Sequence, residues 1–150
     1  MTRWIKIAVA AAAFATLGAH AETLDEAKAL QEAAVAEVKA KGLDAAVADF
    51  NANAGGKWHK GGLYLVIAKF DGHMLAHSAN GKIVGKNMLE AKDAGGKPFV
   101  KDAIDLVKTK GGGQFTMRWA NPKTKQIDDA TFLVRPLPGA DAYLGTVVFN

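Results

Sequence analysis

An apolar run from Leu63 to Phe70, followed at once by Asp71-Gly72, constrains the fold of this chain more than any other feature. The run is dense in β-forming residues, and Asp-Gly between two such stretches is a strong signal for a tight hairpin turn. We therefore predict a strand over residues 63–70 and an antiparallel partner over residues 73–78. Side chains alternate along a strand, so the odd-numbered residues from Leu63 to Ile67 should share one face of the sheet.

The chain before this hairpin has a helical pattern. Apolar residues recur every three or four positions, with Glu and Lys on the other side, at Leu24, Ala27, Leu30, Ala34 and Val38. Thr23 and Glu26 have the spacing of a capping box, which predicts where the helix starts. Gly42 should end this helix in a left-handed cap. A second short amphipathic segment should follow over residues 43–50, and residues 51–62, rich in Asn and Gly, are predicted to form a loop.

One more helix and three more strands are predicted after the hairpin. Val100, Ile104 and Val107 show helical spacing after Pro98, and three successive glycines should end that helix. Strand-like patterns separated by polar or Pro-Gly turns then follow, over residues 114–119, 131–137 and 143–149. This order predicts an α+β fold in which a long N-terminal helix and a helical crossover pack on one face of an antiparallel sheet of about five strands.

The first residues have the three parts of a secretory signal peptide. Arg3 and Lys6 give a cationic start, and an uncharged apolar run follows over residues 7–19. Ala19-His20-Ala21 then offers small residues at the two positions that a signal peptidase reads. We predict cleavage between Ala21 and Glu22, and an uncleaved N-terminal anchor is the alternative.

Removal of residues 1–21 would leave residues 22–150 as a single domain, which we expect to be soluble and either periplasmic or secreted. The apolar run is shorter than the roughly 20 residues of a bilayer span, and no later stretch is apolar enough to cross a membrane. Without this leader, Lys+Arg falls from 19 to 17 against 15 Asp+Glu, so the formal charge drops from +4 to +2. The lysines are scattered and form no cationic face, so we predict no nucleic-acid partner.

Catalytic and metal-binding patterns are missing from the sequence. It has no cysteine, and therefore no thiolate chemistry, disulfide or cysteine-ligated metal. It also lacks a Gly-x-Ser-x-Gly elbow, a phosphate-binding loop and a metal-spaced cluster of His, Asp and Glu. His73 and His77 share strand parity, but their side chains should stand roughly 13 Å apart, and His59 is alone in a loop. We therefore predict a binding module that is not an enzyme and uses no cofactor or metal.

Several short motifs resemble, in their order and spacing, those of the single-Cache family, second subtype. They are Gly42-Leu43-Asp44-Ala45-Ala46, Leu63-Tyr64-Leu65-Val66, Asp71-Gly72, Leu75-Ala76-His77, Gly85-Lys86-Asn87, Gly96-Lys97-Pro98-Phe99-Val100, Arg118-Trp119 with Asn121-Pro122, and Gly145. The resemblance spans about Leu30 to Phe149. These domains are extracytoplasmic PAS-like sensors, common on chemoreceptors and histidine kinases, and members with known ligands tend to bind small organic acids.

The resemblance implies a PAS-like fold with a small organic ligand held between the sheet and the crossover loops. It also implies a signalling role. Because no output module or membrane helix follows the last predicted strand, we expect the signal to pass to a partner such as a membrane receptor or a kinase.

The resemblance places five side chains at or near the ligand, namely Tyr64, His77, Met117, Trp119 and Phe132. Trp119 resembles the tryptophan of the family's Tyr-x-Trp-x-x-Pro strand end, and it would form an apolar wall with its indole N–H directed at a carboxylate. His77 would donate a hydrogen bond to the same group, and the Tyr64 hydroxyl would orient the ligand. The alternatives are core packing for Trp119 and Tyr64, and a buried, backbone-bonded histidine for His77.

Two cations are further candidates for contact with an anionic ligand. Arg118 adjoins Trp119 but alternates to the opposite side of an ideal strand, so it would face the ligand only if the strand twists or bulges. The alternative is a surface arginine. Lys97 lies in a loop that borders the pocket in the family, and the alternative is a solvated loop lysine.

The chain departs from the family pattern where hydroxyl groups and a cation are expected. Met117 replaces the tyrosine of Tyr-x-Trp, Asp129 and Phe132 stand where Lys-x-x-Tyr is common, and Phe149 replaces a terminal tyrosine. Because a buried carboxylate without partners is costly, we expect weak binding of acetate-sized acids and better binding of a larger molecule with one polar end. The alternative is a periplasmic protein-interaction module whose small-molecule pocket has degenerated.

Overall fold

The computed structural model describes residues 21–150. Residues 1–20, which include nearly all of the predicted signal peptide, lie outside this range. In chain order the elements are α1 (Leu24–Lys41), α2 (Leu43–Asn51), the 3₁₀ turn η1 (Ala54–Gly56), β1 (His59–Lys60), β2 (Leu63–Lys69), β3 (Met74–His77), the 3₁₀ turn η2 (Gly81–Ile83), α3 (Phe99–Lys110), β4 (Gly113–Ala120), β5 (Ile127–Pro136) and β6 (Ala142–Phe149).

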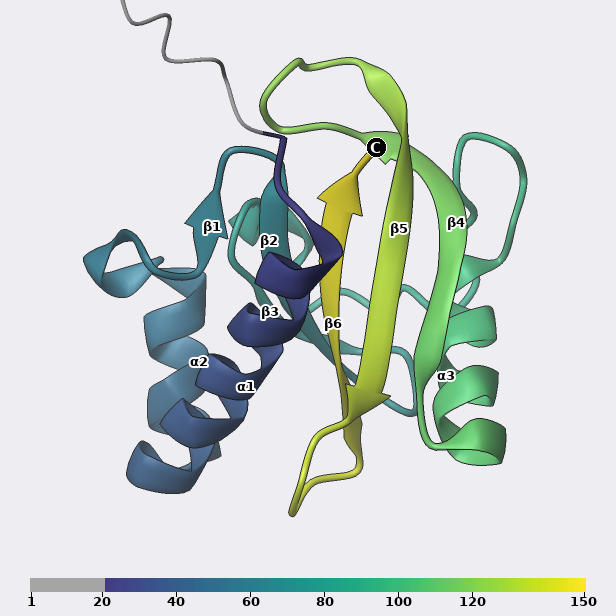
Figure 1. Cartoon of the computed structure of the whole chain (residues 1–150). Coiled ribbons are helices and arrows are strands. Elements are labelled where there is room, and N and C mark those ends of the chain that lie inside the picture. Colours follow the sequence, from purple (N-terminus) through teal and green to yellow (C-terminus); the bar gives the residue numbers. More distant parts are fainter. Residues whose placement is uncertain (1–20) are drawn as a thin grey trace, which may run out of the picture.

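The strands form one antiparallel sheet in the order β1-β2-β6-β5-β4, with β3 also paired to β2 (Figure 1). The predicted α+β fold is therefore confirmed. The hairpin turns at Asp71-Gly72 as predicted, and it brings Val66 opposite His77. The predicted loop before it contains one short extra strand, because His59 and Lys60 pair with the start of β2 across a two-glycine turn.

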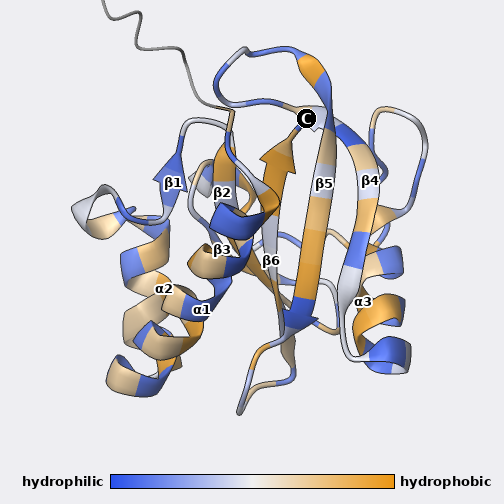
Figure 2. Cartoon of the chain, in the orientation of Figure 1, coloured by the Kyte–Doolittle hydropathy of each residue, from blue (hydrophilic) through white to orange (hydrophobic). Residues whose placement is uncertain are grey.

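Helices cover both faces of the sheet, whereas the sequence analysis placed them on one. As predicted, Leu63, Leu65 and Ile67 share a face, and that face packs against α1 and α2. The even-numbered residues of β2 pack against α3 on the opposite face. All eight residues of β6 are buried, so this central strand needs an apolar cover on both sides. Figure 2 shows orange and pale residues along much of β2 and β6, while blue residues are frequent in the helices and turns.

Local contacts define the two ends of α1, and one buried hydrogen bond attaches this helix to the sheet. The capping box is present as predicted, because the Thr23 hydroxyl accepts from the Glu26 N–H and the Glu26 carboxylate accepts from the Thr23 N–H at 2.7 Å. Gly42 ends the helix at φ 84° with an extended ψ of 163°, so its φ is positive but it does not form the expected left-handed cap. The buried Gln31 amide donates to the Leu133 carbonyl of β5 at 2.8 Å.

Gly145 leaves space on β6 for an aromatic ring of the neighbouring strand. A Cβ atom added at Gly145 would stand 2.8 Å from Cζ of Phe132 and 3.1 Å from Cγ2 of Val66. Both distances are shorter than ordinary carbon contacts. The glycine in the family motif is therefore required here by the close approach of Phe132, which lies on the α3 face.

Gly145→Ala should lower the free energy of unfolding by about 1–3 kcal/mol, because the added methyl overpacks the core against Phe132. Urea denaturation measures the change. Gly81→Ala is the control, since a Cβ there meets nothing within 4 Å, and it should stay within about 0.5 kcal/mol of the parent. The double variant Gly145→Ala/Phe132→Leu should cost less than the sum of its single changes; additive costs would contradict this explanation.

Candidate functional site

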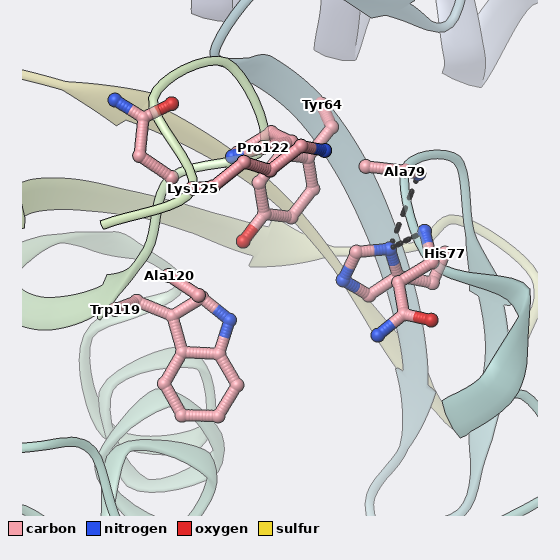
Figure 3. A pocket seen from close by; sticks show the side chains of 9 residues that line it. Tyr64, His77, Ala79, Trp119, Ala120, Pro122 and Lys125 are labelled. Carbon is pink, nitrogen blue, oxygen red and sulfur yellow. Dashed lines mark hydrogen bonds between the residues drawn. The ribbon is translucent and has the colours of Figure 1, made fainter. Parts of the chain in front are cut away.

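A pocket of about 290 Å³ lies where the ends of β2, β3 and β4 meet two loops, and we call it the outer pocket. It is partly open to solvent. Its walls come from β2, from β3 with the loop that follows it, and from the end of β4 with the turn into β5 (Figure 3). The lining residues are Tyr64, His77, Ala79, Asn80, Trp119, Ala120, Asn121, Pro122 and Lys125.

The buried side chain of His77 is held by the loop that follows β3. Its Nδ1 atom accepts from the backbone N–H groups of Ala79 at 3.2 Å and Asn80 at 2.8 Å. Burial, helped by the nearby His59, lowers the pKa of His77 to about 4, so the ring is neutral near neutral pH. Since Nδ1 is an acceptor, the single proton is on Nε2. Figure 3 shows that second nitrogen on the side of the cavity.

Tyr64 and Trp119 carry two more donors of this pocket. The Tyr64 ring stacks on His77 with ring centres 4.7 Å apart. Burial raises the pKa of Tyr64 well above its usual value, so the hydroxyl keeps its proton. The indole of Trp119 packs on Phe99 with ring centres 4.8 Å apart, and Figure 3 shows its nitrogen directed toward the cavity.

The electrostatics of the outer pocket favour an acceptor or an anion. O–H or N–H groups of Tyr64, His77 and Trp119 face it, Lys125 contributes an ammonium group, and no carboxylate is among its lining residues. A small number of convergent polar groups beside apolar walls is typical of a small-molecule site.

A smaller space of about 20 Å³ adjoins the outer pocket, and we call it the inner chamber. Tyr64, His77 and Trp119 line both spaces, so the two spaces meet at these side chains. Apart from these three and Tyr143, the chamber wall is apolar, and it consists of Val66, Met74, Ile83, Met88, Phe99, Met117, Phe132 and Val147. The structure thus brings together Tyr64, His77, Met117, Trp119 and Phe132, the five residues that the sequence analysis placed at or near the ligand.

The two predicted cations do not line either space. The Arg118 side chain points to the other face of β4 from Trp119, because adjacent strand residues alternate, and its Nε lies 3.5 Å from the Asp129 carboxylate. The Lys97 ammonium donates to the Thr116 carbonyl at 2.6 Å and is thereby held at the edge of β4. Neither residue is therefore placed at the candidate site in this structure.

Asp93 positions the edge of the site from the loop before α3. Its carboxylate accepts from the backbone N–H groups of Arg118 at 2.9 Å, Lys97 at 2.8 Å and Gly95 at 2.9 Å. Burial acts to raise the pKa of Asp93, but these three bonds outweigh it and lower the pKa below its usual value. The loop before α3 is thus attached to β4 beside Trp119, which fixes the wall of the pocket.

Local sequence patterns did not indicate the pocket residues that come from turns. Asn80 and Lys125 line the outer pocket, yet nothing in their local sequence indicates it. The turn after β4 depends on Asn121, whose amide donates to Asp128 at 2.9 Å and accepts from the Lys123 N–H at 2.9 Å. The Asn121-Pro122 pair of the family motif was the available signal for this turn.

Within residues 21–150, no group of three or more His, Asp or Glu side chains lies close enough to hold a metal ion. No helix in that part of the chain is long and apolar enough to cross a membrane.

Comparison with known proteins gives one family and a consistent fold. The sequence matches the family described as single Cache domain 2 over residues 11–149, a longer span than the motifs indicated. No curated protein matches the chain.

Three solved structures share the fold at identities too low to show more than that. A methyl-accepting chemotaxis protein from Vibrio parahaemolyticus RIMD 2210633 has a TM-score of 0.68 and 21% identity, covering 83% of this chain and 86% of its own. A periplasmic sensor domain of a chemotaxis protein has a TM-score of 0.64 and 18% identity, covering 83% and 88%. A Cache chemosensory domain studied for carboxylic acid recognition has a TM-score of 0.64 and 21% identity, covering 83% and 86%.

Proposed function

The chain belongs to the single Cache domain 2 family, and on that premise we propose that it is an extracytoplasmic sensor module that binds a small organic acid in the outer pocket. A membrane receptor or a histidine kinase is the class of partner that we propose for it. Sensor domains of chemotaxis proteins share its fold, which supports this role.

One observation carries the proposal, namely the convergence of three uncharged donors on one pocket. Tyr64, His77 and Trp119 each present an O–H or N–H group that no hydrogen bond within residues 21–150 occupies. The neutral state of His77 matters, because an imidazole with Nδ1 bonded to the loop can only donate from Nε2. Hydrogen bonds to a charged acceptor are the stronger kind, so a carboxylate gains most from these groups.

The same geometry directs the rest of the ligand toward the inner chamber. A carboxylate held by the three donors would have its hydrocarbon part beside the apolar wall that includes Met117 and Phe132. These two residues replace groups that are able to hydrogen-bond in the family pattern. We therefore propose a monocarboxylate with a chain longer than that of acetate.

Affinity should rise from acetate to propanoate in a series of linear acids up to hexanoate, and it should stop rising once the end of the chain fills the inner chamber of about 20 Å³. Each methylene that leaves water contributes about 0.8 kcal/mol, or about fourfold in affinity, until the cavity is full. Isothermal titration calorimetry on purified protein, with a panel of amino acids alongside, measures the trend. Binding of acetate that is as tight as that of the longer acids would overturn this reading of Met117 and Phe132. Binding of none of these compounds would favour the protein-interaction alternative.

A further inference from the structure

The hydroxyl of Tyr143 is the unexplained polar group next to the proposed site. Tyr143 is fully buried, and its oxygen has no hydrogen-bond partner within residues 21–150. An unsatisfied buried hydroxyl costs about 1–3 kcal/mol, so a group that supplies a partner would be favoured at this position.

Strand register and the contact at Gly145 show that the Phe132 ring extends along the sheet toward Tyr143, beside the inner chamber. Tyr143 is paired with Pro136 on β5, while Phe132 is four residues away on that strand and opposite Val147. Four residues correspond to about 13 Å of strand, yet the ring centres of Tyr143 and Phe132 are only 6.2 Å apart. The two rings therefore approach one another over the space that Gly145 leaves open, and Tyr143 forms part of the chamber wall.

We propose that Tyr143 is a ligand-recognition residue, and that the inner chamber receives an oxygen atom at the far end of the bound acid. This inference rests on the proposed function. The chamber volume of about 20 Å³ is close to what one water-sized group occupies, so a single hydroxyl or carbonyl group fits. The ligand class is then a short monocarboxylic acid with a hydroxyl or keto oxygen at or near the end of its chain.

The same surroundings disfavour a dicarboxylic acid. A second carboxylate in the chamber would meet one neutral hydroxyl, Tyr143, within a wall of methionine, phenylalanine and aliphatic side chains. Burying a charge with so few partners costs several kcal/mol. Specificity for an uncharged terminal oxygen follows from that penalty.

Matched pairs of acids test the inference. Isothermal titration calorimetry would compare the linear acids from propanoate to hexanoate with the ω-hydroxy acid of equal length. At the best-fitting length the parent protein should prefer the ω-hydroxy acid about fivefold, which is the typical net worth of one hydrogen bond. Tyr143→Phe should abolish the preference. Lys125→Gln, which changes only the outer pocket, should weaken both members of the pair and leave their ratio unchanged.

The outcomes separate this inference from the proposed function. If the linear acids bind but no length shows a preference for the ω-hydroxy acid, the role of Tyr143 is wrong and the sensor function stands. If Tyr143→Phe still prefers the ω-hydroxy acid, the role of Tyr143 is likewise wrong and the sensor function stands. If neither series binds to the parent, the proposed function fails and the role of Tyr143 fails with it. Thermal unfolding confirms that the variant folds, and its Tm should be no lower than that of the parent, since the change removes an unpaired hydroxyl.

Discussion

The free energy of unfolding should fall by about 3 kcal/mol as the pH is lowered from 6.5 to 4, mainly through His77. Burial lowers the pKa of this histidine from 6.5 to about 4 in the folded protein. Between these values the unfolded chain binds a proton that the native protein does not, so acid favours unfolding. The stability that depends on neutral His77 is fully present above pH 6.5. It is lost as the pH falls toward 4, at about 1.4 kcal/mol for each pH unit.

Other buried titratable groups act outside this window. Asp93 has a pKa below its usual value of 3.8, so its contribution to stability is lost only at still lower pH. Tyr64 and Tyr143 have raised pKa values and stay protonated throughout. The slope of stability between pH 4 and 6.5 is therefore a measure of His77.

Urea denaturation at several pH values should show a flatter slope in His77→Asn. The Asn oxygen can replace Nδ1 as acceptor for the loop N–H groups of Ala79 and Asn80, so the variant should fold while losing the titration. His73→Asn is the comparison variant, because the His73 side chain is 49% exposed and contacts Asp71, and the change in slope should be smaller there than in His77→Asn. A slope that remains unchanged in His77→Asn would show that His77 is protonated in the folded protein at a normal pKa.

Local sequence signals predicted those parts of the fold that depend on neighbouring residues. The capping box at Thr23, the break at Gly42 and the turn at Asp71-Gly72 are each set by the conformational needs of a few adjacent residues. The position of α3 on the face opposite to α1 could not be predicted in this way. Apolar residues at both odd and even positions of β2 are consistent with two covered faces. They do not indicate which helix covers which face of the sheet.

The candidate site was predictable only where strand parity and the family pattern agreed. Tyr64 and Trp119 follow both, and they face the same side of the sheet. Arg118 follows the family pattern, but it alternates with Trp119 along β4. Its side chain therefore points to the other face of the strand. Lys125 depends on a turn. Tyr143 became visible only through its unpartnered hydroxyl and its place in the chamber wall, which result from tertiary packing and have no local sequence signal.

Trp119→Ala should lower the affinity for the best-bound linear acid about thirtyfold. The Trp119 ring lines the outer pocket and the inner chamber together, and it is packed on Phe99. Its removal would widen the passage between the two spaces and delete both an apolar wall and the indole N–H. A buried aromatic residue at the centre of a binding site typically accounts for about 2 kcal/mol, which corresponds to the thirtyfold loss.

Trp119→Phe separates the two contributions of this residue to binding. Phenylalanine keeps most of the wall but has no N–H donor, so its affinity should lie between those of the parent and the alanine variant. Calorimetry on the three proteins with the same acid measures both steps. A loss in Trp119→Phe as large as that in Trp119→Ala would mean that the N–H, and not the ring surface, holds the ligand. Equal affinity in all three proteins would remove Trp119 from the site, and would leave its contact with Phe99 as simple core packing.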